Sequence, residues 1–126
     1  KRERRTQMDK QMITLPLPPT TNHTYLTTKY KHGTYKSKEA KDWENLAGYE
    51  LIPYRPKKPL LGALYCQIDL FLKRDRDVDG SNKLVLDLLQ AMRFYENDSQ
   101  ITHLNIRKFV DKTNPRMEID IKSLQE

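Results

Sequence analysis

Three aspartates at alternate positions, Asp75, Asp77 and Asp79, followed by Gly80, form the segment with the clearest capacity for chemistry. Carboxylates at this spacing are typical ligands of hard divalent cations such as Ca²⁺ and Mg²⁺. An EF-hand calcium loop begins in the same way, but it needs a glutamate at its twelfth position, where this chain has Leu86. The preceding residues also alternate like a strand, unlike the entering helix of an EF-hand. We therefore reject a calcium loop and consider Mg²⁺.

Asp77 and Asp79 are predicted to lie between the end of a strand and the start of a helix, where both side chains can point into one concavity. Mg²⁺ is usually held by a few carboxylates, while waters and phosphate oxygens complete its six-fold coordination. Asp98 follows the same helix, and we expect it to approach the same end of the sheet and to supply a third ligand. Such a site would set the cation against a phosphate.

Lys83 is predicted to lie in the first turn of that helix, where unpaired backbone N–H groups already favour an anion. A cation there opposes the helix dipole, which makes sense if its ammonium group reaches a phosphate or orients an attacking hydroxide. The alternative is a solvated lysine paired with Asp87 one turn later. For Asp75 we expect a position at the rim and an ion pair with Lys73 or Arg76.

Two predicted helices and four predicted strands carry these residues. Apolar residues recur at three- and four-residue steps in two segments, 37–51, with Ser37 as N-cap, and 82–92. Period-two alternation predicts strands at 12–15, 63–73, 101–110 and 116–122, the last two around a turn at 111–115. The predicted fold class is α+β, a small mixed sheet of about four strands with two main helices.

Length and composition favour one small cytoplasmic domain. A chain of 126 residues fits a single compact domain, with residues 1–11 as a basic flexible tail and 12–126 as the domain. The tail is either an arm for nucleic acid or a solvated terminus. Cys66, on the apolar face of the 63–73 strand, is the only cysteine, which excludes an intramolecular disulfide and a cysteine-cluster zinc site. No apolar run approaches the roughly 18 residues of a membrane helix, so we expect no membrane partner.

The charge is unevenly distributed along the chain. Up to Pro59 there are 13 basic and 6 acidic residues, whereas from Leu60 onward there are 10 and 11. A basic surface beside carboxylates suits a protein that holds a polyanion by its phosphates, although a merely soluble basic protein is the alternative. The candidate DNA-binding residues are Lys29, Lys31, Lys36, Lys38, Arg55, Lys57, Lys58, Arg74 and Arg76.

Three segments in this order, LPLPPTTNHTY, RDVDGSNKLVLDLL and ENDSQI followed by a strand, resemble the RusA family of Holliday-junction resolvases. The resemblance spans roughly residues 13–121. It implies a small α+β homodimer that binds four-way or other branched DNA and uses Mg²⁺, or Mn²⁺ in its place, to nick two strands of like polarity symmetrically. It implies no small-molecule cofactor, and it implies a bacterial or phage-infected cell as the setting.

Carried over by position, the family's two motif aspartates fall on Asp77 and Asp79, its downstream acidic ligand on Asp98 and its essential lysine on Lys83. The chain departs from the family pattern at two places.

Gly80 stands where the family usually has asparagine, and it mainly relaxes the turn. Asn97 replaces an acid beside Asp98, which lowers the charge of the site and predicts weaker metal affinity. Two other functions stay open: a basic DNA-binding module without catalysis, and a metal nuclease acting on flaps or other branched DNA.

Overall fold

A computed structural model describes residues 12–19, 25–27, 34–75 and 82–124 of the chain. The predicted tail, residues 1–11, lies outside the described residues. The elements are β1 (Ile13–Leu15), β2 (Tyr25–Thr27), β3 (Thr34–Lys36), α3 (Lys38–Leu51), η1 (Ile52–Tyr54), β4 (Leu64–Leu72), α4 (Asn82–Ala91), η2 (Asp98–Gln100), β5 (Ile101–Val110) and β6 (Arg116–Ser123).

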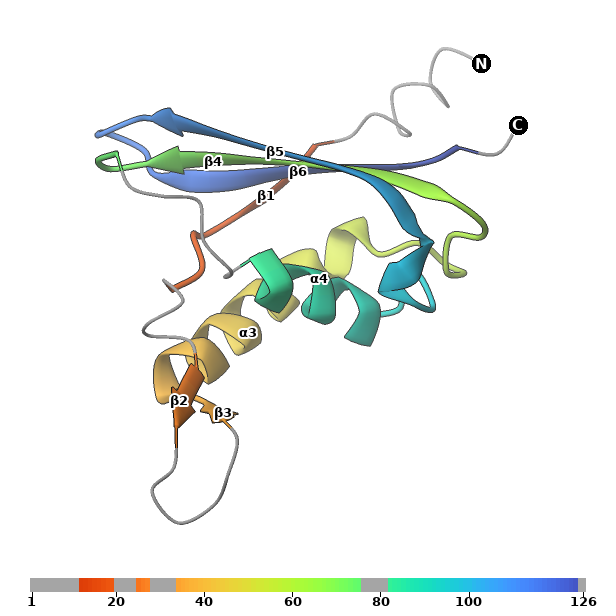
Figure 1. Ribbon diagram of the computed structural model, residues 1–126, viewed down its shortest axis with the longest axis horizontal. Helices are drawn as coiled ribbons and strands as arrows, with labels where there is room; N and C mark the ends of the chain where they lie inside the picture. Colours follow the sequence, from red (N-terminus) through yellow and green to blue (C-terminus); the bar gives the residue numbers. More distant parts are fainter. Residues whose placement is uncertain (1–11, 20–24, 28–33, 76–81, 125–126) are drawn as a thin grey trace.

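Four strands form one mixed sheet in the order β1-β6-β4-β5, in which β4 pairs parallel with β5 and antiparallel with β6. Both α3 and α4 lie on one face of this sheet, and within the described part of the chain no helix covers the other face (Figure 1). The predicted α+β class is confirmed. β2 and β3 form a separate two-stranded ladder, which was not predicted.

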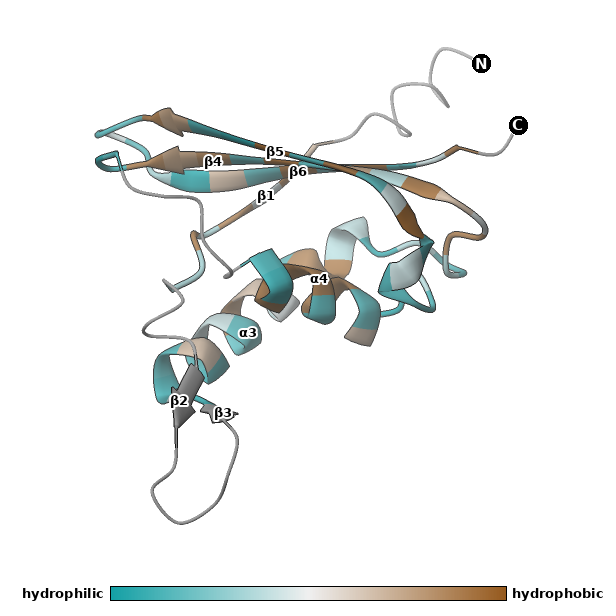
Figure 2. Cartoon of the chain, viewed as in Figure 1, coloured by the Kyte–Doolittle hydropathy of each residue, from teal (hydrophilic) through white to brown (hydrophobic). Residues whose placement is uncertain are grey.

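The core lies between the sheet and the helices, and β4 shows why. Its residues Leu64, Cys66, Ile68 and Leu70 are buried at 0 to 4% exposure. Hydrophobic and hydrophilic residues alternate along this strand, and hydrophobic ones recur on α4 (Figure 2). The two periods, two for a strand and about 3.6 for a helix, therefore turn the apolar side chains of both elements toward each other.

Helix α3 begins and ends where its sequence predicts. Ser37 is the N-cap, and its Oγ accepts a hydrogen bond of 3.1 Å from the Ala40 N–H. Trp43 is buried at 6% exposure, and its Nε1–H donates to the Pro16 carbonyl at 2.9 Å. This bond joins the helix to the proline-rich segment after β1. Pro53 lies in the short 3₁₀ helix η1, which directly follows the last residue of α3.

The predicted turn at 111–115 connects strands that are not neighbours, because β4 lies between β5 and β6. The Asp111 N–H donates to the Leu72 carbonyl at 2.7 Å, so the connection crosses the end of β4. The Asp111 carboxylate accepts backbone hydrogen bonds from Thr113 and Asn114 at 3.2 and 3.1 Å. A side-chain acceptor of this kind stabilises a tight bend, and here the bend carries the chain over the central strand.

Replacing Ile68 by alanine tests this account of the core. Ile68 has 0% exposure at the centre of β4, and removal of a buried aliphatic side chain costs about 2–5 kcal/mol through lost burial and an unfilled cavity. Urea denaturation should show a loss of free energy of unfolding in that range. The control Leu61→Ala, at a side chain that is 68% exposed, should stay within about 0.5 kcal/mol of the wild type. Equal losses in the two variants would contradict the assignment.

Candidate functional site

The acid-rich segment lies between β4 and α4, and the structure describes both of its flanks. These flanks are residues 73–75 after β4 and α4 from Asn82 onward. Six of the residues singled out in the sequence lie outside the described part of the chain: Lys29, Lys31, Arg76, Asp77, Asp79 and Gly80.

Asp75 lies just beyond the end of β4 and forms an ion pair across the sheet. Its Oδ1 is 3.0 Å from Nζ of Lys108 on β5, and its side chain is 74% exposed. We expected a pair with Lys73 or Arg76, but the described partner is a cation on the neighbouring strand. Sequence spacing did not predict this contact, because it depends on the parallel pairing of β4 with β5.

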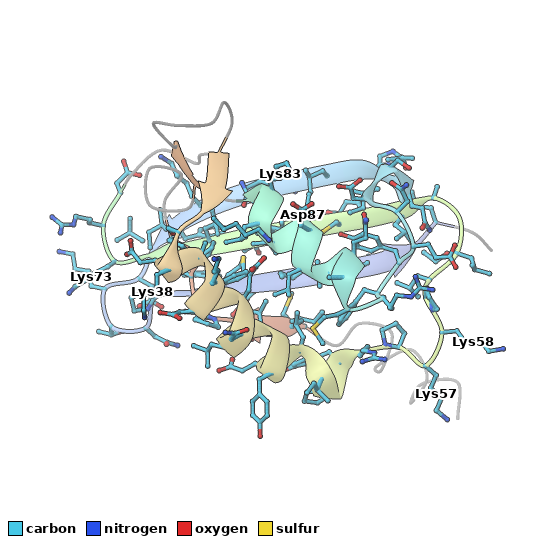
Figure 3. All side chains as sticks on the ribbon, turned by 90° about the horizontal axis from the view of Figure 1, so that it is seen from below. Lys38, Lys57, Lys58, Lys73, Lys83 and Asp87 are labelled. Carbon is cyan, nitrogen blue, oxygen red and sulfur yellow. The ribbon has the colours of Figure 1, made fainter. Side chains whose placement is uncertain are left out.

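Lys83 lies in the first turn of α4, as predicted. Its Nζ is 3.0 Å from Oδ2 of Asp87, which confirms the expected pairing one turn along the helix. The Lys83 side chain is 70% exposed, and both residues lie on the outer side of α4 (Figure 3). An exposed pair at this spacing contributes only a few tenths of a kcal/mol, about 0.3–0.5.

Asp98 opens the short helix η2, and hydrogen bonds fix its backbone. Its N–H donates to Oε1 of Gln90 at 2.8 Å. Asn97 is the N-cap, and its Oδ1 accepts from the Ser99 N–H at 2.9 Å, while Gln100 Oε1 accepts from the Asn97 N–H at 3.1 Å. This is a capping box. Asn97, one of the two departures from the family pattern, thus has a structural part in presenting Asp98.

Gln100 also determines where η2 lies relative to the sheet. Its Nε2 donates to the carbonyls of Leu60 and Gly62 at 3.0 and 2.9 Å, just before β4 begins. Asp98 therefore lies beside the start of β4.

Asp75 follows the end of β4, whereas Asp98 precedes β5 beside the start of β4, so the two residues lie at opposite ends of the sheet. β4 and β5 pair over nine positions, from Leu64 with Ile101 to Leu72 with Val110, and at about 3.3 Å per residue their ends are about 26 Å apart. We expected Asp98 at the end where β4 stops, and this expectation is wrong. Parallel strands need a crossover connection, so α4 returns the chain to the start of β4 before β5 begins.

The residues predicted to hold a metal share oxygen donors, which suits Mg²⁺ or Mn²⁺ in preference to a soft cation. Within the described ranges, no three His, Cys, Asp or Glu side chains come together as a metal site. The described residues thus contain one of the three predicted ligands, Asp98, with an exposed side chain.

Candidate DNA-binding cations lie at both ends of the described part of the molecule. Lys38 lies at one end, where Lys73 also lies, and Lys57 and Lys58 lie at the other (Figure 3). The side chains of Arg55, Lys57, Lys58 and Arg74 are exposed. Two candidates are engaged by carboxylates of α3: Lys36 Nζ lies 2.6 Å from Glu44, and Lys38 Nζ lies 2.9 Å from Asp42. The Asp42 carboxylate raises the pKa of Lys38, so its cationic form is favoured.

One polar cluster was not predicted from the sequence. On the sheet face away from the helices, Arg107 donates to both oxygens of Asp69 at 2.8 Å, and Asp69 is only 5% exposed. The pair raises the pKa of Arg107, chiefly through its hydrogen bond to Asp69. Asn105 and Tyr65 both donate to Gln67, at 3.1 and 2.7 Å. The alternation of β4 predicted an outward position for Asp69, but not its partner on another strand.

Aromatic rings and arginines continue this face. The Phe71 and Phe109 rings stack with centroids 5.0 Å apart. Arg116 lies over Phe71 at 3.9 Å and Arg107 over Phe109 at 5.3 Å. The stack joins β6, β4 and β5, and cation–π contacts of this kind stabilise the arrangement modestly.

An acid-rich segment between a strand and a helix, with exposed cations at both ends of a small α+β fold, defines a class of candidate nucleic-acid enzymes. Residues 16–122 match the family described as Endodeoxyribonuclease RusA. This match covers most of the chain, which therefore belongs to the RusA endodeoxyribonuclease family. The predicted resemblance is confirmed, and with it an endonuclease that binds DNA and acts in Holliday-junction resolution and recombination.

None of the curated proteins compared matches the chain. Among the described residues, no helix is both long enough and apolar enough to cross a membrane.

The reactivity of Cys66 tests its assignment as a core residue. Burial raises the pKa of its thiol to about 12, so the thiol stays protonated at pH 8. Ellman's reagent at pH 8 should leave the folded protein unmodified and should react fully after urea is added. A Tyr49→Cys variant is the positive control, because Tyr49 is 76% exposed. Rapid modification of Cys66 in the folded wild type would contradict its burial.

Proposed function

We propose that this protein is a structure-specific endodeoxyribonuclease that resolves Holliday junctions by metal-dependent, symmetric phosphodiester hydrolysis. The proposal takes residues 12–126 as one nuclease domain that works as a homodimer in the cytoplasm of a bacterial or phage-infected cell. The observation that carries it is family membership across residues 16–122, together with an acid-rich segment between β4 and α4.

The proposed metal ligands are Asp77, Asp79 and Asp98. When bound there, Mg²⁺ supplies positive charge that polarises a phosphate and lowers the pKa of a coordinated water. The chain itself supplies a second cation. Lys83, at the start of α4, exchanges its exposed partner Asp87 for a phosphate oxygen and stabilises the negative charge that develops during attack.

The position of Asp98 leads us to propose that each site uses residues of two subunits. Asp75 lies just beyond the end of β4 and precedes Asp77 by two residues in the sequence, and two residues of chain span at most about 7 Å. Asp98 lies at the other end, about 26 Å away at 3.3 Å per strand residue. Carboxylates that share one Mg²⁺ must each approach to about 2.1 Å. A second copy of the chain, turned around, brings its Asp98 to the end that carries Asp77.

The exposed cations support DNA binding through phosphates. Contacts to phosphates position the protein on DNA but do not read its bases. Lys73 lies at one end of the molecule, and Lys57 and Lys58 lie at the other (Figure 3). We propose that they contact different arms of a branched substrate. Affinity should accordingly fall with rising salt as counterion release becomes less favourable.

The first test is cleavage of a labelled four-way junction beside a linear duplex of the same arms, with Mg²⁺, with Mn²⁺ and with EDTA. We expect paired nicks in the junction with either metal and none with EDTA. Asp77→Asn should lower cleavage by about 10³-fold or more, since charge stabilisation of this kind contributes several kcal/mol to catalysis. Its junction binding should persist.

The matched control is Glu50→Gln, an exposed acid of α3, which should cleave like the wild type. A wild type that binds junctions without cutting under any metal would support a non-catalytic DNA-binding module. Equal cutting of junctions, flaps and forks would support a nuclease for branched DNA in general.

Mixing two inactive variants tests whether a site is shared. Asp77→Asn and Asp98→Asn should each be inactive alone. If ligands come from two subunits, a mixed dimer contains one intact site, with Asp77 from one chain and Asp98 from the other, and it should nick one strand of the junction. The variants are co-expressed with different tags, and the mixed dimer is purified by both tags. Inactivity of the mixed dimer would show that the ligands act within one subunit.

A further inference from the structure

The outer edge of β5 is the long free edge of the sheet. β5 has ten residues and ends the strand order, while the opposite edge is the three-residue β1. In the described part of the chain, β5 pairs only with β4, and this ladder is regular from His103 to Val110. Its outer side therefore offers a row of backbone N–H and C=O groups. Native proteins usually shorten, bulge, charge or cover such an edge, because it readily pairs with another strand.

The side chains of β5 do not protect this edge. Leu104, Phe109 and Val110 are 46, 40 and 52% exposed, which is unusual for large apolar residues of one strand. The strand contains no proline. Its two cations are engaged within the subunit, since Arg107 pairs with Asp69 at 2.8 Å and Lys108 with Asp75 at 3.0 Å. Paired charges repel an approaching strand less than free ones do.

Two other surfaces are weaker candidates for a partner. On the open face of the sheet, polar side chains bond to one another, as in the Asp69–Arg107 pair, and the Phe71 and Phe109 rings stack on each other. These polar side chains already have partners within the subunit, so they do not need a second protein. The outer side of α3 and η1 exposes Leu46, Tyr49 and Ile52, but a helix has no unpaired backbone along its side. Within the described part of the chain, β5 is the long edge strand that combines exposed apolar side chains with an open outer edge.

We propose that β5 pairs antiparallel with β5 of a second copy, around a two-fold axis at Asn105, so that two four-stranded sheets form one. The proposal rests on the homodimer of the proposed function and names its interface. A two-fold axis makes one surface complementary to itself, and an edge strand paired antiparallel with its own copy meets this condition. An axis at Asn105 also keeps Arg107 and Lys108 of the two strands from lying opposite each other, since like charges directly opposite destabilise a pair.

The proposed pairing agrees with the positions of the site residues. In an antiparallel pair the start of one strand lies beside the end of the other. Asp98, just before β5, would thus come to the end of the second copy where Lys73–Asp75 follow β4. The pairing that covers the outer edge of β5 would thus also bring Asp98 of one copy to the site of the other. The open edge favours this pairing whether or not these ligands share a metal.

Cysteine cross-linking without DNA tests the interface. Directly opposite residues near the axis have Cβ atoms about 4.5–5.5 Å apart, close enough for a disulfide after a small backbone adjustment. Asn105→Cys should therefore give a disulfide-linked dimer under mild oxidation, whereas Tyr49→Cys, on the outer side of α3, should stay unlinked. Cys66 is present in both variants and is buried, so it does not confuse the result. Cross-linking through Tyr49→Cys alone would overturn the proposal.

A second variant tests the same interface without relying on disulfide formation. Leu104→Lys places a charge near Lys108 of the second copy, so sedimentation should show at least a tenfold weaker dimer with an unchanged circular dichroism spectrum. Leu46→Lys on α3 should dimerise like the wild type. A dimer unaffected by Leu104→Lys would overturn this interface while leaving the proposed homodimer intact, and a wild type that is monomeric at all concentrations would overturn both. Junction cleavage, measured separately, shows whether the nuclease proposal survives either result.

Discussion

The parallel pairing of β4 with β5 is the constraint on which the placement of functional residues depends. Parallel neighbours cannot be joined by a tight turn, so the chain leaves the end of β4, passes through α4 and re-enters at the opposite end. Asp75, at the start of the acid-rich segment, and Asp98 are therefore separated by the length of the sheet. The proposed metal site has to bridge that length, and the proposed second subunit would do so without distorting either element.

The elements themselves were largely predictable, because each depends on local physics. Alternation along β4, the helical period of residues 82–92 and the cap at Ser37 all appear in the structure at the expected places. Family membership was also predictable, since three motifs in fixed order define it. These signals share one property: the residues that carry them are close together in the sequence, so no knowledge of pairing is needed to interpret them.

Pairing between distant segments was not predictable to the same degree. The strand order puts β4 between β5 and β6, although only a short turn connects these two strands in the sequence. The incorrect prediction of the end of the sheet at which Asp98 lies has the same cause. One helix between two strands does not reveal the relative direction of the strands until their pairing is known. The Asp69–Arg107 pair joins residues 38 positions apart, and each residue alone is an ordinary polar position on a strand. Asn97, by contrast, gains a clear local role as a cap once η2 is recognised.

The stack of Arg116, Phe71, Phe109 and Arg107 has a consequence for how the sheet assembles. A slip of one residue in any of the three strands would turn its member of the stack toward the helices and bring an apolar residue out. The stack therefore forms only when the three strands pair in the native register. This matters for β4 and β5 in particular, since parallel pairing across a crossover is slow to form. The open face of the sheet is thus constrained by strand register, as the core is. The residues of the stack are therefore less replaceable than their exposure suggests.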